Sequence, residues 1–263
     1  MPKGQIIDSH AHLTWDSFAE DQEEVIGRAF AEGVVQIVQA GVDLKTIPEM
    51  VQLTEKYKEI FIGVGLHPHE AKIWNADADK QIREAAKHAR VVGIGECGLD
   101  FYYNHSDRDA QMLCFKAQIE IARDLNKPLI IHSRDAWEDT FQLLEEIGQG
   151  KVSGVFHCFT GGPEVLPRIE ALDFYVSFSG IVTFANAKNI QAAAPLVKKD
   201  RILVETDCPY LAPQPVRGKR NEPSYVWHVA EKLAQLRGVA VEQIAEQTVV
   251  NARRLFKLPE ETR

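Results

Sequence analysis

The stretch Pro128-Leu129-Ile130-Ile131-His132-Ser133-Arg134, with the residues that follow it, decides the fold class of this chain. A short apolar run rich in isoleucine is typical of a buried strand, and the polar residues behind it end the strand. Across Ala136–Ile147 the apolar residues recur at helical spacing, as Trp137, Phe141, Leu144 and Ile147. Asp135 and Glu138 predict a capping box at the start of this helix. This part of the chain therefore predicts a strand followed by an amphipathic helix.

The same alternation extends over the whole chain. Eight β-rich runs are present, at Gln5–Asp8, Val34–Val38, Ile60–Val64, Val91–Ile94, Pro128–Ile131, Gly154–Phe156, Phe174–Phe178 and Arg201–Val204. Dividing 263 residues by eight gives about 33 per unit, enough for a strand, a helix and two loops. Repeated βα units predict a parallel sheet, and the count of eight favours a single closed (β/α)8 TIM barrel over residues 1–263. An open doubly wound sheet is the alternative.

Further helices are expected between these runs and after the last one. The amphipathic segments include Phe18–Glu32, Ile47–Tyr57 and Gln111–Leu125, and Ser224–Phe256 predicts one or two helices more. No linker or low-complexity tract divides the chain, which supports a single domain.

Composition and charge restrict the class of protein. With 45% hydrophobic and 26% charged residues, the chain resembles an ordinary globular protein. Its net charge of −8 excludes a generally cationic protein that coats nucleic acid. It does not exclude a local basic patch or metal-mediated binding of phosphate. The four cysteines form no CxxC pair, and neither a signal peptide nor an apolar run of about 20 residues is evident. We therefore expect a cytoplasmic protein with reduced thiols, no membrane partner and no obligate protein partner.

Two histidines end the first run, in Asp8-Ser9-His10-Ala11-His12. Side chains alternate across a strand, so His10 and His12 share a face and lie about 6–7 Å apart along it. Two imidazoles placed in this way can converge on one metal ion. The alternative is a pair of exposed loop histidines.

Glu96 lies in Gly93-Ile94-Gly95-Glu96-Cys97-Gly98, which matches the GxGxxG pattern of dinucleotide sites. That fingerprint opens a helix, whereas residues 99–104 are typical of a loop, and Glu96 would face an anionic pyrophosphate. Dinucleotide binding is therefore disfavoured. A carboxylate between glycines, at the end of a strand, fits a bridge between two cations better.

Three more candidates follow the fifth, sixth and eighth runs, namely His132, His157 and Asp207. Each has a simpler interpretation by itself, as a core histidine or a loop aspartate. Together with the first three, however, they place six candidates at the C-terminal ends of strands, where barrel enzymes have their active sites. Imidazole and carboxylate ligands suit two borderline cations such as Zn²⁺ or Mn²⁺. Neither a GxSxG elbow nor a GxxxxGK[ST] loop competes with this hypothesis.

The sequence blocks around these residues resemble the TatD family of metal-dependent deoxyribonucleases, within the amidohydrolase superfamily of barrels. The matching blocks run in family order over most of the chain, as Asp8–Leu13, Gly65–His69, Gly95–Asp100, Lys127–Arg134, His157–Gly161, Glu205–Leu211 and Arg217–Pro223. Cys97 and Cys208 depart from the family pattern, which has small or aliphatic residues at these positions, and neither disturbs a predicted ligand.

The resemblance implies a hydrolase with two divalent cations, Mg²⁺, Mn²⁺ or Zn²⁺. One cation would be bound by His10, His12 and Asp207, and the second by His132 and His157. Glu96 would bridge both, in the place where several larger relatives use a carbamylated lysine. In some members of the family, the residue at Glu205 contacts a metal.

The same resemblance implies catalytic and substrate-binding roles. Asp207 would act as general base on a water held between the cations. His67 and Arg134 would contact the substrate phosphate. The expected reaction is hydrolysis of single-stranded DNA, with nucleotides removed from one end of the strand.

Two loops and two other functions stay open. Arg217, Lys219 and Arg220 could track a nucleic-acid backbone or simply form a solvated loop. Residues 101–103, Phe-Tyr-Tyr, could stack an unpaired base or pack between loops. The alternative enzyme is a dinuclear hydrolase of a small-molecule ester, amide or phosphoester, because this fold carries many substrates. A non-enzymatic metal-dependent scaffold is disfavoured by the complete ligand set.

Overall fold

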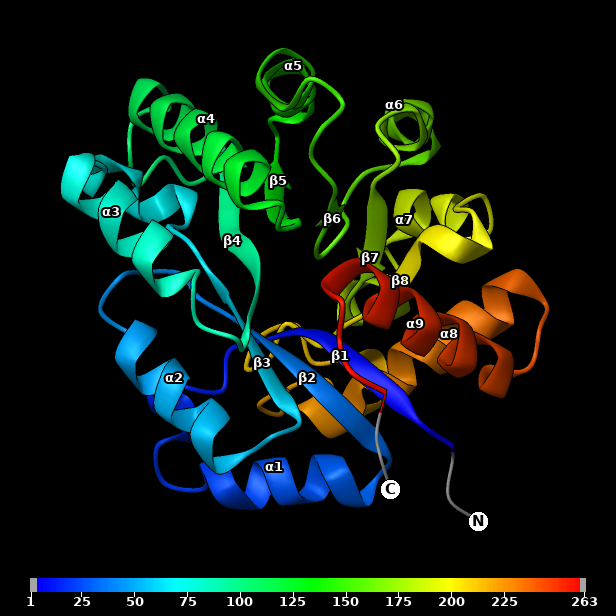
Figure 1. Cartoon of the computed structure of the whole chain (residues 1–263). Coiled ribbons are helices and arrows are strands. Elements are labelled where there is room, and N and C mark those ends of the chain that lie inside the picture. Colours follow the sequence, from blue (N-terminus) through cyan, green and yellow to red (C-terminus); the bar gives the residue numbers. More distant parts are fainter. Residues whose placement is uncertain (1–3, 261–263) are drawn as a thin grey trace. The chain divides into compact units, whose positions relative to one another are not determined.

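A computed structural model describes residues 4–260, and the eight strands of this range follow one another in the sheet in chain order (Figure 1). Their bounds are β1 Ile6–Ala11, β2 Val34–Ala40, β3 Ile60–Val64, β4 Val91–Asp100, β5 Leu129–Arg134, β6 Gly154–Phe156, β7 Tyr175–Phe178 and β8 Ile202–Val204. Each strand overlaps one predicted run. The largest difference is at β4, which continues past the predicted end at Ile94 to Asp100. Glu96 therefore lies inside a strand, and residues 99 and 100 are not in a loop.

Within residues 4–260, one α-helix follows each of the first seven strands and two follow the eighth. Their bounds are α1 Gln22–Ala31, α2 Ile47–Lys56, α3 Ala76–Ala85, α4 Arg108–Leu125, α5 Trp137–Gly148, α6 Leu166–Ala171, α7 Lys188–Ala193, α8 Val226–Arg237 and α9 Val241–Phe256. This alternation confirms the (β/α)8 TIM barrel. The predicted capping box at Asp135 is wrong. Asp135 has a φ of 52°, the N-cap residue of α5 is Ala136, and no side chain caps the helix.

Residues 4–39, 157–167 and 175–260 form one compact unit. Here β1 pairs with β2, and β7 pairs in parallel with β8. The segment after β8 returns to β1: the amide of Asp207 donates to the carbonyl of His10, and that of His12 to Cys208, both at 2.9 Å. The first and last strands are thus neighbours, as closure of a barrel requires.

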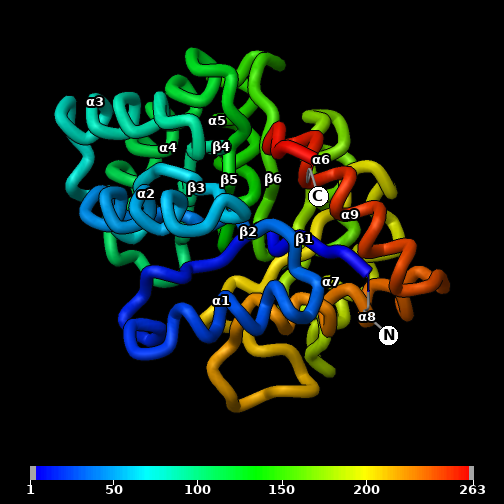
Figure 2. The backbone as a smooth tube through the Cα atoms, turned by 60° about the horizontal axis from the view of Figure 1, so that its bottom comes forward, coloured from blue at the N-terminus to red at the C-terminus, as the bar shows by residue number. Residues whose placement is uncertain are grey.

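The helices of this unit bury its strands. Helix α9 packs on β1 and β8 and lies beside α8 (Figure 1). Figure 2 shows α1 beside the segment that leads into α8, where Pro223–Tyr225 contacts it. Trp227 is almost completely buried, and its indole N–H donates to the carbonyl of Glu32 at 2.7 Å.

Residues 40–156 and 168–174 form a second compact unit. Strands β3 to β6 pair in parallel, and the partners along β4 and β5 include Gly98↔His132 and Asp100↔Arg134. Helix α4 covers β4, with Phe115 fully buried. The rings of Phe141 and Phe156 lie 5.7 Å apart in the same core. This register places the end of β4 beside the end of β5.

Two glycines of the GxGxxG match serve this strand pairing. A Cβ at Gly98, where φ is +135°, would lie 2.0 Å from the carbonyl oxygen of His132. A Cβ at Gly95 would lie 2.4 Å from that of Ile130. Since β4 continues through the motif and α4 begins only at Arg108, no helix opens where a dinucleotide site needs one. The glycines allow close approach of two strands.

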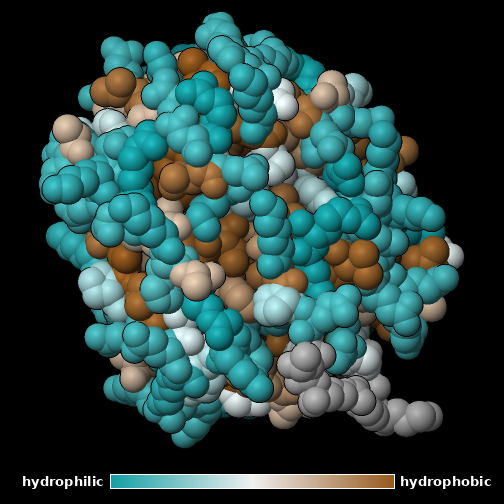
Figure 3. All heavy atoms as spheres, viewed as in Figure 1, coloured by the Kyte–Doolittle hydropathy of each residue, from teal (hydrophilic) through white to brown (hydrophobic). Residues whose placement is uncertain are grey.

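Figure 3 shows a face dominated by hydrophilic side chains, with apolar residues scattered among them. Among the helices of residues 4–260, none combines the length and the apolar composition needed to cross a bilayer.

Candidate active site

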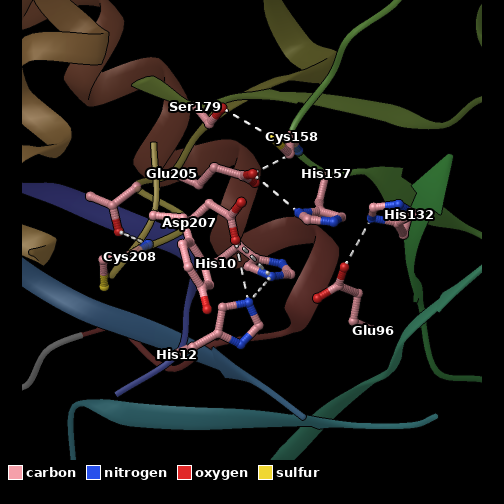
Figure 4. Close-up of polar contacts among 12 residues, drawn as sticks. His10, His12, Glu96, His132, His157, Cys158, Ser179, Glu205, Asp207 and Cys208 are labelled. Carbon is pink, nitrogen blue, oxygen red and sulfur yellow. Dashed lines mark hydrogen bonds and ion pairs between the residues drawn. The ribbon is translucent and has the colours of Figure 1, made fainter. Parts of the chain in front are cut away.

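Three side chains from β1 and from the segment after β8 point their ligand atoms toward one another (Figure 4). The Nε2 atoms of His10 and His12 are 3.2 Å apart. Oδ1 of Asp207 lies 3.3 Å from Nε2 of His12 and 3.7 Å from Nε2 of His10. All three side chains are largely buried. The structure thus brings together the residues predicted to share one cation.

The buried side chain of Asp8 holds these three residues in position. Oδ2 of Asp8 lies 2.6 Å from the hydroxyl of Thr206, and its Oδ1 accepts from the amide of Thr206 at 2.9 Å. Burial raises the pKa of Asp8 to about 8, against the effect of these hydrogen bonds. The Asp8–Thr206 contact ties the segment after β8 to β1 and places Asp207 beside the histidines.

Asp207 has the opposite protonation behaviour. Burial by itself raises its pKa, but the hydrogen bond with His12 and the neighbouring imidazoles outweigh burial, and the pKa is lowered. Two buried aspartates with opposite shifts have different roles. Asp207 is the ionised one, able to bind a cation or accept a proton, whereas Asp8 is a structural contact.

His157 lies directly after β6, in the same unit as His10, His12 and Asp207, and contacts this group. Its ring stacks on that of His10 at a centroid distance of 3.9 Å. Its Nδ1 lies 3.3 Å from Oε1 of Glu205, which also accepts from the amide of Cys158 at 2.6 Å (Figure 4). Glu205 is fully buried, and its Oε2 has no hydrogen-bond partner among residues 4–260. Burying a carboxylate oxygen without a partner is costly, so this position favours a nearby cation.

The second unit contains another set, centred on Glu96 of β4. Its Oε1 lies 3.2 Å from Nε2 of His67 and 3.1 Å from Nδ1 of His132. Burial lowers the pKa of His67 to about 4, despite the opposing effect of Glu96, so the ring is neutral at pH 7. Nδ1 of His67 accepts from the amide of His69 at 3.1 Å, which leaves the ring proton on Nε2. His67 therefore donates toward Glu96.

Two residues of this set were missed by the sequence analysis, Asp100 and His69. Oδ2 of Asp100 accepts from Nε2 of His132 at 3.0 Å and from Nε2 of His69 at 3.1 Å. Asp100 is buried, which opposes ionisation, but the hydrogen bonds from His132 and the backbone of Tyr103 outweigh burial and lower its pKa. Metal-binding histidines commonly donate their second N–H to such a carboxylate. Asp100 thereby orients His132.

Both sets have the donor chemistry that divalent cations need. If His132 is neutral and donates through Nε2 to Asp100, the lone pair of its Nδ1 faces the carboxylate of Glu96 at 3.1 Å. Two acceptors at that distance repel unless a proton or a cation lies between them. The same holds for the facing Nε2 atoms of His10 and His12. Imidazole nitrogens and carboxylate oxygens together are the ligands that bind Zn²⁺ and other borderline cations.

Arg134 and the aromatic loop after β4 form a separate feature of the second unit. The guanidinium of Arg134 lies 4.0 Å from the ring centroid of Tyr102 and 4.7 Å from that of Tyr103. Phe101 is covered by Arg108 at 4.4 Å. The two tyrosines are exposed, so of the three aromatic residues they are the ones that face solvent.

The basic loop after β8 is partly used in packing. Arg220 contacts both carboxylate oxygens of Asp21, at 2.9 and 2.6 Å, and lies over the ring of Phe18. Arg217 lies 4.1 Å from the ring centroid of Phe184. Arg220 therefore holds the loop to the start of α1, and its charge is compensated.

Three of the four cysteines are buried packing residues. Cys97 and Cys208 are fully buried, and burial raises the pKa of each thiol well above its usual range. Burial also raises the pKa of Cys114, to about 12. These thiols stay protonated.

Strand ends of a parallel (β/α)8 barrel that present imidazole and carboxylate groups define the class of metal-dependent barrel hydrolases. The family described as TatD related DNase matches residues 7–257, and the chain belongs to this family. The metal-dependent hydrolase YabD of Bacillus subtilis is 45% identical over 253 residues, which cover 96% of this chain and 99% of that protein. This confirms the predicted family and the hydrolytic class.

Two further relatives extend the comparison. The 3′-5′ ssDNA/RNA exonuclease TatD of Escherichia fergusonii is 35% identical over 256 residues, covering 95% of this chain and 98% of that protein. The crystal structure of YJJV, a TatD homologue from Escherichia coli K12, has a TM-score of 0.91 and 25% identity, covering 97% of this chain and 98% of that one. The barrel fold is therefore shared over the whole length.

Proposed function

We propose that this member of the TatD family is a phosphodiesterase that removes nucleotides from an end of single-stranded DNA. The observation that carries the proposal is the convergence of ligand atoms from His10, His12 and Asp207 within 3.7 Å. The relative named as an ssDNA/RNA exonuclease supports the substrate class.

The proposed enzyme uses two divalent cations, Mg²⁺, Mn²⁺ or Zn²⁺. His10, His12 and Asp207 would hold one and His132 with His157 the other, while Glu96 would bridge them. When bound, the cations would lower the pKa of a water molecule and neutralise charge on the phosphodiester. This also explains how a chain of net charge −8 could bind a polyanion.

The chain's own groups would perform the remaining chemistry. Asp207, which is ionised, would orient the attacking water and take its proton. His67, neutral and protonated on Nε2, would turn this N–H from Glu96 to a non-bridging phosphate oxygen once Glu96 binds the cations. Arg134 would supply a planar cation for the same group. Two of these roles depend on protonation states: the hydrogen bond with His12 favours the ionised form of Asp207, and burial favours the neutral form of His67.

The test is a nuclease assay on the full chain after removal of metals with a chelator. Mg²⁺, Mn²⁺ or Zn²⁺ is then added with end-labelled single-stranded DNA. We expect metal-dependent laddering that falls to background in His10→Ala and in Asp207→Ala. His228→Ala, a histidine on α8 that pairs with Glu231, is the matched control and should keep full activity.

Metal content tests the dinuclear part separately. Elemental analysis of the reconstituted protein should give two cations per chain, and Glu96→Ala should bind fewer. DNA left intact with every metal, while a small ester or phosphoester is hydrolysed, would refute the nuclease and assign a small-molecule substrate instead. A single cation per chain in the fully active protein would refute the pair.

A further inference from the structure

The loop after β4 presents an exposed aromatic ring with a cation over it. Tyr102 is 58% exposed and Tyr103 51%, and the two rings meet edge to face at 4.8 Å. The guanidinium of Arg134 lies 4.0 Å from the centroid of Tyr102 and covers one face of that ring. Because Tyr102 is more than half exposed, a large part of its ring stays accessible to solvent although Arg134 lies over one face.

This loop is held in place rather than loose. Oδ1 of Asp100 accepts from the amides of Tyr102 and Tyr103, both at 3.0 Å. The ring of Tyr103 is also stacked nearly parallel to His105, at a centroid distance of 5.7 Å. An exposed aromatic ring on a fixed backbone loses little entropy when a ligand covers it. The geometry therefore favours a built binding surface.

Asp100 also connects this loop to the candidate metal ligands of its unit. The second oxygen of Asp100 accepts from His132, whose other nitrogen faces Glu96. Arg134 lies two residues after His132 on β5, which places the two side chains on one face about 6–7 Å apart. A substrate whose phosphate reaches His132 would thus have its neighbouring groups at the ring of Tyr102.

We propose that Tyr102, backed by Arg134, is a stacking platform for one nucleobase of the substrate strand. This rests on the proposed nuclease function and adds a specificity-determining residue to it. Every base has a π-face, so a ring with a cation behind it binds bases without reading sequence. A base stacked within a duplex has neither face free. The platform therefore selects unpaired strands.

The test compares Tyr102→Ala and Tyr102→Phe with Tyr57→Ala as matched control. Tyr57 also has a cation over its ring, Lys56 at 5.5 Å, but precedes β3 and so belongs to the opposite end of the strands of its unit. The substrates are a single-stranded DNA oligonucleotide and an abasic oligonucleotide of the same length and charge. The metal-reconstituted full chain is used throughout.

We expect Tyr102→Ala to raise KM for the DNA oligonucleotide about 5- to 150-fold, the loss typical of one base stack. Tyr102→Phe should restore KM, and Tyr57→Ala should leave it unchanged. On the abasic strand, wild type and Tyr102→Ala should be equal. Unchanged KM for DNA in Tyr102→Ala would overturn the platform. So would an equal loss on both substrates, because that pattern indicates a structural role of the loop.

A binding readout separates failure of the platform from failure of the nuclease proposal. An oligonucleotide carrying 2-aminopurine is titrated into chelator-treated protein, and stacking on the ring should quench its fluorescence in wild type and Tyr102→Phe only. DNA that stays intact in every assay would refute the proposed function. Cleavage by wild type with identical quenching in wild type and Tyr102→Ala would refute the platform alone.

Discussion

Replacing Asp100 by asparagine tests how His132 is oriented. The carboxylate of Asp100 accepts hydrogen bonds from four N–H groups, two of them imidazole donors at Oδ2 and two of them backbone amides at Oδ1. Asparagine has the same shape but only one acceptor oxygen. Whichever way the amide turns, its NH₂ group faces one pair of donors. Asp100→Asn therefore removes two hydrogen bonds without creating a cavity.

The magnitude follows from the number and kind of bonds. Hydrogen bonds to a buried charged group contribute about 1.5–3 kcal/mol each, and local rearrangement recovers part of two lost bonds. We expect the free energy of unfolding of metal-free protein to fall by about 2–4 kcal/mol. Because His132 also loses the carboxylate that orients it, cation affinity should fall about 10- to 100-fold.

Two measurements check this prediction. Urea denaturation at pH 7 gives the change in unfolding free energy, and competition with a chromophoric chelator gives the cation affinity. Asp139→Asn is the control, since Asp139 forms an exposed ion pair with Arg108 and should change stability by about 0–1 kcal/mol. Asp100→Asn with the stability and affinity of wild type would refute the role of Asp100.

The pH dependence of the same variant has a definite sign. The pKa of Asp100 is lowered in the folded protein, because the hydrogen bonds from His132 and Tyr103 outweigh burial. The stability that its carboxylate contributes is therefore fully present above the unfolded pKa of ~3.9 and is lost as pH falls through the folded pKa. The gap between wild type and Asp100→Asn should narrow only in that acidic range. A gap that already closes near neutral pH would contradict this assignment.

Three other variants make separate predictions. Glu96→Ala should lose metal-dependent activity while circular dichroism stays that of the folded protein, and an active variant would end the dinuclear proposal. Gly98→Ala places a Cβ 2.0 Å from the carbonyl of His132 at a φ of +135°, so urea denaturation should show a loss of about 1–3 kcal/mol or more. The pKa of Glu222 is lowered because the hydrogen bond from Arg28, 2.8 Å away, outweighs burial. Glu222→Gln should therefore lower the melting temperature at pH 7, and the difference should vanish as pH falls below about 4.

The strands were predictable because a strand that is buried on both faces consists mostly of apolar residues. Each apolar run is buried on both faces in a parallel sheet, so Pro128–Ile131 and its equivalents needed no knowledge of their neighbours. The end of β4 was not predictable in this way. Gly95 and Gly98 weaken any local preference for a strand, and the continuation to Asp100 depends on pairing with β5. Local sequence cannot report a partner strand that lies more than thirty residues away.

The residues of the candidate site also differ in how far local sequence could predict them. His10, His12 and Asp207 were predicted as ligands because each lies at the end of an apolar strand or shortly after it, where the active-site side chains of a barrel lie. Asp100 contacts His132 and His69 contacts Asp100, and neither residue carries such a signal by itself. Asp100 does lie four residues after Glu96, the spacing that shares a strand face, but that counts only if the strand continues through two glycines. The register between β4 and β5 thus places Asp100, an acidic residue expected in a loop, where it orients a candidate metal ligand, and Asp100→Asn measures the size of that effect.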